Sequence, residues 1–282
     1  MSTSWEVSER QLERLAFRRR QDRRRMTIAL VSTAVVLVGV GLLVTSAPGW
    51  DRVRETYFDW EDAKAAFPEI AKAFWVNIKA FLVAEVLILA LAMLVAVVRV
   101  VPSAWMAPLK VVATVYTDVF RGTPTLLIVL LVGFGVPTLG LQGTPTDPFW
   151  LGVIALTLSY GAYVAEVLRA GILSVHPSQW ASGRALGLSY GKTLRYVVLP
   201  QAVRRVTPPL LNDFVSLQKD TALLSAIGVF EALRQAQVYS ARDFIFTPMV
   251  VAAVFFIVAT IPLARFTDWL SLRAARRQSG AA

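Results

Sequence analysis

The sequence predicts an all-α protein that crosses a membrane with about six transmembrane helices. Of its 282 residues, 56% are apolar, and the mean hydropathy is +0.56. This composition leaves too few polar side chains to cover a soluble domain of this length. Several apolar runs also approach the roughly 20 residues that an α-helix needs to cross a bilayer. We therefore expect a polytopic membrane protein in contact with the lipid bilayer.

The distribution of charge supports this prediction and orients the chain. Residues 1–26 hold eight Arg and four acidic residues, residues 47–72 hold four basic and six acidic residues, and residues 174–205 hold five basic residues and no acidic residue. Residues 265–282 hold four Arg and one Asp. The positive-inside bias then places both termini in the cytoplasm. The net charge of +10 is segregated in loops and tails, so we expect no nucleic-acid partner.

The residue inventory excludes several kinds of site. The chain has no cysteine, its only histidine is His176, and no carboxylate cluster is evident, so we expect no metal site. Residues 187–193 resemble a phosphate-binding P-loop, but three residues separate the glycines where the motif needs four. We find no arrangement of nucleophile, base and orienting acid. We therefore expect no catalytic residue and no cofactor on this chain.

The first third of the chain predicts two transmembrane helices. The basic tail 1–26 precedes the apolar run 27–45, which is long enough to span and lacks a clear signal-peptide cleavage site. Aromatic and acidic residues in 47–72 indicate an outer interfacial segment. Residues 73–98 return inward as the second helix and contain Glu85. A buried acid at this depth either serves function or packs against a polar neighbour.

The next segments predict a broken helix and a continuous one. Residues 103–122 form a partly interfacial inner helix, and Gly122 and Pro124 interrupt it. Residues 126–136 continue that crossing to the outside. After a turn-rich outer connection, residues 149–168 return inward.

The last third predicts two more crossings after a basic loop. Residues 202–228 form a helix that Pro208 and Pro209 break and that carries charged residues. Such a helix is tolerated at membrane depth only where protein or a water-filled cavity surrounds it. Residues 229–247 are polar and lie outside, and residues 248–266 form the sixth helix.

The basic loop 174–200 contains the signals of two short helices. Pro177 suits the first turn of a helix over 179–186, and Gly187 suits the position just after its end. Ser189 is a typical N-cap of the next helix, which Pro200 ends or kinks. The first helix has a face of small residues that another protein can approach closely. This loop is either a docking segment or an ordinary cytoplasmic loop, and the pattern alone leaves both open.

The same loop resembles the cytoplasmic signature of the permease subunits of ABC importers for polar amino acids such as histidine, glutamine, glutamate and arginine. That signature reads Glu-Ala-Ala, three residues, Gly, nine residues, then Ile-x-Leu-Pro. It aligns here with Ala181-Ser182-Gly183, Gly187 and Val197-Val198-Leu199-Pro200, with its full spacing. Further segments resemble family motifs in family order: FRGTP at 120–124, AYVAEVLRAGI at 162–172, LPQAVRR at 199–205, PPLLND at 208–213 and KDTALLSAIG at 219–228.

The resemblance implies a five-helix permease domain over residues 70–270, with a cytoplasmic coupling loop at 174–200. Residues 27–69 are then an added N-terminal helix and outer segment, and residues 271–282 a basic cytoplasmic tail. The implied function is the translocation path of an ATP-driven importer in a bacterial inner membrane. The implied partners are ABC ATPase subunits that hold ATP and Mg, an extracytoplasmic solute-binding protein, and a second permease subunit or a second copy of this chain.

The resemblance also implies which residues contact the ATPase. They are Gln179, Ala181, Ser182, Gly183, Ala185, Leu186 and Gly187. Ala181 stands where the family signature has a glutamate that is thought to help fix the loop against the ATPase. Its absence implies a weaker grip by this subunit or a companion permease that supplies the acid.

A substrate path is less sharply indicated. An amino acid needs an anion for its ammonium group and donors for its carboxylate, and the candidates for lining the path are Thr123, Glu166, Asn212 and Thr221. We expect Arg121, Lys219 and Asp220 to form structural ion pairs between helices instead. The alternative function is an ATPase-independent secondary carrier or a membrane interaction protein. A carrier often shows an internal repeat, and we find no convincing one.

Overall fold

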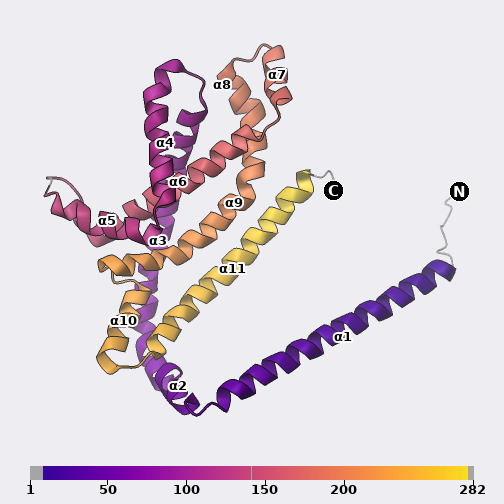
Figure 1. The fold of residues 1–282 in the computed structure, drawn as a ribbon, viewed down its shortest axis with the longest axis vertical. Helices are drawn as coiled ribbons and strands as arrows, with labels where there is room; N and C mark the ends of the chain where they lie inside the picture. The colour runs from indigo at the N-terminus through magenta and orange to yellow at the C-terminus, as the bar shows by residue number, and fades with distance from the viewer. Residues whose placement is uncertain (1–8, 141, 279–282) are drawn as a thin grey trace. The chain divides into compact units, whose positions relative to one another are not determined.

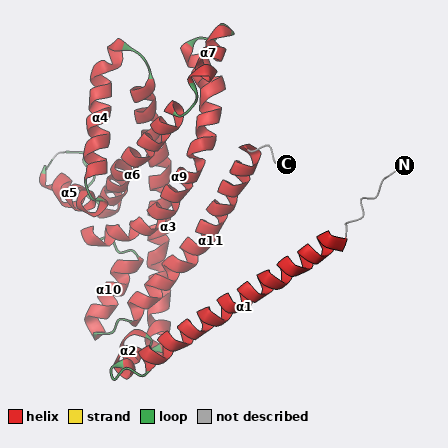
Figure 2. Ribbon diagram, turned by 45° about the vertical axis from the view of Figure 1, so that its right-hand side comes forward, coloured by secondary structure: helices red, strands yellow, loops and turns green. Residues whose placement is uncertain are grey.

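The computed structural model describes residues 9–140 and 142–278, and within them the chain consists of helices and connecting loops (Figure 2). The chain divides into two compact units, Met1–Thr56 and Tyr57–Ala282.

The first unit is dominated by α1, Glu9–Thr45. This helix begins well inside the segment that was predicted to be a basic tail, because Arg, Gln and Glu are good helix formers and extend the apolar helix backwards. Its part from Arg20 to Thr45 is long and apolar enough to cross a membrane. The short helix α2, Trp50–Tyr57, follows within the predicted interfacial segment.

The second unit opens with α3, Trp60–Val100. The Asp59 side chain caps it by accepting hydrogen bonds from the backbone N–H groups of Glu61 and Asp62. The prediction that this helix begins near residue 73 was wrong, because the Asp59 cap and the acidic residues Glu61 and Asp62 stabilise polar first turns ahead of the apolar run. The expected start of the permease domain at residue 70 therefore falls inside α3.

The predicted interruption at Gly122–Pro124 is confirmed. Helix α4, Ala107–Gly122, ends there, and α5, Thr125–Thr138, leaves at an angle of 109°. A short 3-10 turn, Ala104–Met106, precedes α4. Helix α6, Pro148–Leu173, is capped by the Asp147 side chain and includes the predicted helix 149–168.

The basic loop folds into α7, Pro177–Ala185, and α8, Tyr190–Thr193. Pro200 does not end the helix that begins at α8. A π-helical turn, Leu194–Val198, leads directly into α9, Leu199–Asp220. The predicted break at Pro208 and Pro209 was also wrong, because α9 runs through both prolines.

The departure from α-helix comes after α9. Residues Thr221–Ile227 form a 3-10 helix that ends at Gly228, whose φ of 86° is left-handed. Residues 229–247, predicted as a polar connection, instead contain α10, Ala232–Asp243. The last helix, α11, spans Thr247–Gln278 and extends past its predicted end at residue 266 into the basic tail.

Four helices within the described residues are long and apolar enough to cross a membrane, or five spans if the bent α4–α5 pair counts as one. The four are α1, α3, α6 and α11. The predicted crossing over residues 202–228 corresponds to α9, which does not qualify because charged residues interrupt its apolar positions. The fold is thus an all-α polytopic membrane protein.

Helices α3 and α6 form the centre of the second unit (Figure 1). Their contact is rich in small buried residues, including Ala84, Ala92 and Ala165, which let helix backbones approach closely in a membrane. At Gly161 an added Cβ atom would lie 2.9 Å from both the Leu91 side chain and the Tyr116 hydroxyl. This close packing fixes α6, and the C-terminal end of α6 carries the basic loop.

Candidate functional site

Three residues separate the end of α6 from the start of α7, whose first turn is capped locally. The His176 Nδ1 atom accepts a hydrogen bond from the Ser178 backbone N–H at 3.2 Å, and Pro177 occupies the first turn. Proline has no backbone N–H group. In the first turn this costs no hydrogen bond, because an N–H group there would have no acceptor within the helix. The predicted start of the short helix is confirmed.

The end of α7 is a complete Schellman motif. The backbone N–H of Gly187 donates to the Arg184 carbonyl at 2.9 Å, and that of Leu188 donates to the Gly183 carbonyl at 3.2 Å. Gly187 has a φ of 78°, a left-handed backbone conformation that glycine adopts more readily than other residues. The predicted caps at Gly187 and at Ser189, which accepts from the Lys192 N–H, are both confirmed.

Contacts with α8 and α9 hold α7 in place. The Trp180 ring stacks on Tyr190 with centroids 5.0 Å apart, and the Tyr190 hydroxyl donates to the Val100 carbonyl at the end of α3. The Gln201 amide on α9 donates to the Gln179 side chain at 3.1 Å. The Arg205 guanidinium also donates to the Ser174 carbonyl. Burial raises the pKa of Tyr190, so this hydroxyl stays neutral and remains a donor.

The small residues of α7 lie on two sides of the helix. Ala181, Ser182 and Ala185 are exposed, and the following Leu186 is 80% exposed. Gly183 is buried, and an added Cβ atom would lie 2.5 Å from Thr193 Cγ2. The expectation that Gly183 lies on the docking face was therefore wrong, because this glycine makes room for α8. Gln179 is half-buried through its contact with α9.

Glu166 ties the base of the loop to the bundle. Its carboxylate accepts from Arg99 on α3 at 2.7 Å and from Arg169 on α6 at 2.5 and 3.1 Å. The same Arg99 donates to Thr117 on α4 at 3.0 Å. Glu166 was proposed as a path residue, but in this structure two guanidinium groups occupy its oxygens. It joins three helices next to the segment that leads to α7.

The other candidate path residues do not gather around Glu166. The Thr123 hydroxyl donates to the Val119 carbonyl of its own helix, and Thr221 is fully buried. Asn212 is exposed on α9. The structure therefore brings no pair of these four side chains together by a hydrogen bond within the described residues.

The expected ion pairs of Arg121, Lys219 and Asp220 are not formed within the described part of this chain. Arg121 lies 6.0 Å from the centre of the Tyr163 ring, and Lys219 is exposed. Asp220 accepts a hydrogen bond from the Tyr160 hydroxyl at 2.8 Å. Helices α6 and α9 are thus joined here by a hydrogen bond from a neutral hydroxyl group to a carboxylate, and not by an ion pair.

Sequence reasoning missed a buried polar cluster at the start of α10. The Asn77 amide on α3 donates to Glu231 at 2.9 Å and to Thr221 at 3.1 Å, and it accepts from the Ala232 N–H. The Glu231 carboxylate also caps α10 through the N–H groups of Leu233 and Arg234. Burial raises the pKa of Glu231, although these donors act in the opposite direction. Glutamate is not among the residues usually preferred at an N-cap, so the sequence carried no strong local signal for the start of α10.

The geometry supports mechanical coupling better than chemistry. Within the described residues, no group of three or more His, Asp or Glu side chains is placed to hold a metal. What the site offers is a short exposed helix whose ends are capped and whose inner face contacts α8 and α9. Helices α3, α6 and α9 each adjoin or contact this loop by packing or hydrogen bonds, so the loop is physically connected to the membrane helices.

Comparison with known families gives a match over most of the second unit. Residues 88–276 match the family of binding-protein-dependent transport system inner membrane components. The L-cystine transport system permease protein TcyB of Bacillus subtilis is 36% identical over 202 residues, which are 72% of this chain and 80% of that protein. The glutamine transport system permease protein GlnP of Escherichia coli K12 is 40% identical over 153 residues, 54% of this chain and 69% of its own length.

Solved structures agree with these sequence relatives. The crystal structure of an amino acid ABC transporter with histidines contains a chain with 30% identity and a TM-score of 0.69, covering 76% of this chain and 98% of that one. A chain of the inward-facing MetNI methionine ABC transporter matches with a TM-score of 0.58 at 16% identity, covering 73% and 95%. The second likeness concerns the fold alone.

Proposed function

Because this chain belongs to the family of binding-protein-dependent transport system inner membrane components, we propose that it forms the translocation path for a polar amino acid and couples to a separate ABC ATPase through α7. In this family the permease is not itself the enzyme, and the ATPase is a separate chain. ATP and Mg then bind on that partner. Residues 27–69 are an addition before the permease domain.

The observation that carries this proposal is the exposed face of α7. Ala181, Ser182, Ala185 and Leu186 are open to a partner, while Gly183 and Trp180 fix the opposite face to α8. A small, rigid surface with one protruding leucine fits a groove on another protein without a large entropic cost. ATP-driven closure of the ATPases then moves α7, and the packed contacts pass that movement to α6 and α9.

The substrate class follows from the named relatives. Their printed names include glutamine and cystine transport systems, and the related crystal structure is of an amino acid transporter. Asn212, an exposed polar residue on α9, remains a candidate for lining the substrate path. Glu166 and Thr221 act instead as ties that hold the helices on either side of the path, since their polar atoms are already bonded.

The membrane arrangement completes the proposal. The protein lies in a bacterial inner membrane with both termini and α7 in the cytoplasm, as the charge distribution favours. A second permease, or a second copy of this chain, completes the path, and an external solute-binding protein delivers the amino acid. With Ala181 in the signature position, a companion permease that carries the acid would share the coupling.

An ATPase-independent carrier is set aside, because the family consists of components of binding-protein-dependent systems. A direct test uses the absence of cysteine from the sequence. Ser182→Cys places a single thiol on the exposed face of α7, and Thr138→Cys places one on the exposed end of α5 as a matched control. A thiol-reactive crosslinker is expected to join the ATPase to the first variant and not to the second.

Function is tested in the same reconstituted system. Proteoliposomes with the ATPase and the solute-binding protein are expected to take up labelled glutamine, arginine, histidine or cystine only when ATP is inside. Uptake that proceeds without ATP, or equal crosslinking of both thiols, contradicts the proposal. The amino acid with the highest uptake identifies the substrate within the proposed class.

A further inference from the structure

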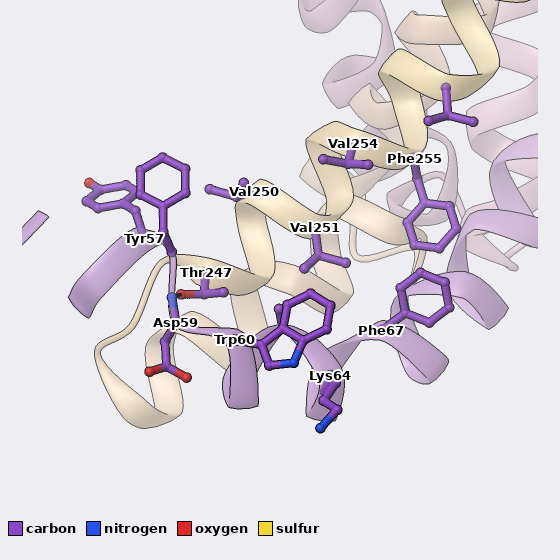
Figure 3. A pocket seen from close by; sticks show the side chains of 13 residues that line it. Tyr57, Asp59, Trp60, Lys64, Phe67, Thr247, Val250, Val251, Val254 and Phe255 are labelled. Carbon is purple, nitrogen blue, oxygen red and sulfur yellow. Dashed lines mark hydrogen bonds between the residues drawn. The ribbon is translucent and has the colours of Figure 1, made fainter. Parts of the chain in front are cut away.

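A long apolar groove lies between the first turns of α3 and the first half of α11. It has a volume of about 640 Å³, and Phe67, Val251, Val254 and Phe255 are among the residues that line it. Figure 3 shows the Phe67 and Phe255 rings side by side along its wall, with their centroids 5.1 Å apart. The groove plays no part in the coupling described above.

The groove has the length of one acyl chain. Its lining runs along α11 from Thr247 to Val258, a rise of about 16 Å at 1.5 Å per residue. Half of the hydrocarbon core of a bilayer is about 15 Å thick. The groove therefore extends from one membrane surface to about the middle of the membrane if α11 crosses it, as its length and composition predict.

The open end of the groove carries the residues that gather at lipid headgroups. Trp60 is 71% exposed at this end, and Lys64 contributes an ammonium group to the same rim (Figure 3). Aromatic rings with one polar atom favour the membrane interface, and a lysine there reaches the headgroup phosphates. Lys64 also lies 3.5 Å from Glu61, but both side chains are mostly exposed. Such a pair contributes little, so Lys64 remains able to bind a phosphate.

We propose that this groove is a phospholipid-binding site, with one acyl chain along Val251, Val254 and Phe255 and the headgroup phosphate at Lys64. The apolar lining contributes to binding through van der Waals contacts with the acyl chain. The rim carries the Asp59 carboxylate as well as Lys64, and the Lys64 ammonium supplies selectivity because a cation favours a phosphate over an uncharged headgroup. The proposed orientation of the permease places this lipid in the outer leaflet; binding itself does not depend on the coupling role of α7.

The test is native mass spectrometry of the delipidated full chain in detergent, titrated with a phosphatidylglycerol and with the diacylglycerol of the same acyl chains. Wild type is expected to bind one phospholipid saturably and to bind the diacylglycerol more weakly. Val254→Trp fills the groove and is expected to weaken phospholipid binding by about tenfold, since the indole displaces several methylene groups. Ile257→Trp is the matched control, because Ile257 is similarly exposed on α11 but does not line the groove.

The headgroup contact is tested separately with Lys64→Gln, which is expected to bind both lipids equally. A preference for phosphatidylglycerol that persists in this variant overturns the role of Lys64. Equal phospholipid binding by Val254→Trp and Ile257→Trp overturns the site. If another helix covers the groove, wild type takes up no saturable phospholipid, which also overturns the proposal. ATP-driven uptake by Val254→Trp is measured in parallel, so that failure of the lipid site is distinguished from failure of transport.

Discussion

The contact between Gly183 on α7 and Thr193 on α8 predicts that a single methyl group at residue 183 impairs coupling. In Gly183→Ala the new Cβ atom would lie 2.5 Å from Thr193 Cγ2 and 3.0 Å from its hydroxyl oxygen. Thr193 is fully buried, so its side chain has little room to move. The helices must separate by a few tenths of an ångström or more to accept the new group.

The magnitude is the difference between two opposing effects. Overpacking of this kind costs about 1–3 kcal/mol, whereas replacing glycine by alanine inside a helix stabilises it by about 1 kcal/mol. We expect a net loss of about 0–2 kcal/mol, concentrated at the α7–α8 contact. Because the loss is small and local, the protein still inserts into membranes, but α7 is displaced from the position that the ATPase contacts.

The assay is ATP hydrolysis stimulated by the solute-binding protein in proteoliposomes, together with the thermal unfolding midpoint. Gly183→Ala is expected to reduce the stimulation, and Gly191→Ala, the same change in α8 with open space around it, serves as the control for helix propensity. Adding Thr193→Ser removes the Cγ2 atom that the new methyl group meets and is expected to restore much of the stimulation. Full activity of Gly183→Ala, or no recovery in the double variant, would refute this reasoning.

Three other substitutions test separate features of the structure. Gly187→Asp places a residue with a side chain in a left-handed backbone conformation, at a cost of about 1–2 kcal/mol. This variant should lose ATP-dependent uptake while it still inserts into the membrane. The control Gly191→Asp, which has open space and no left-handed backbone, should retain uptake. Glu166→Gln leaves two guanidinium groups without their carboxylate and should lower the thermal midpoint, with a loss of about 1–3 kcal/mol. Asn77→Ala removes the side chain that contacts Glu231 and should destabilise the protein by at least about 2 kcal/mol. Amide hydrogen exchange should show that α10 opens first. A thermal unfolding midpoint equal to that of wild type would contradict the role of this cluster.

Local signals in the sequence predicted the parts of the structure that depend on few neighbouring residues. The caps of α7 at Gly187 and of α8 at Ser189 were found because glycine and serine have strong positional preferences at helix ends. The interruption at Pro124 was found because proline and glycine disrupt a regular helix. Apolar runs long enough to cross a membrane likewise predicted the class of fold, because that signal depends on composition and length.

Features that depend on distant residues were not predictable in this way. No pattern in α7 shows that Gly183 faces Thr193 rather than a partner, because that depends on how the chain turns back at Leu188. The continuity of α9 through Pro208 depends on its packing beside α6 and α11, which overrides the local preference. The pairing of Glu166 with Arg99 joins residues that are 67 positions apart in the sequence.

The π-helical turn Leu194–Val198 has a consequence for how α9 responds to α7. A π turn holds one more residue than an α turn of the same kind, and one residue corresponds to about 100° of rotation and 1.5 Å of rise. If the position of the extra residue shifted along the chain, α9 would rotate about its own axis while its backbone hydrogen bonds remained formed. We therefore expect that a displacement of α7 toward the membrane would rotate α9 about its own axis as well as shift it along that axis.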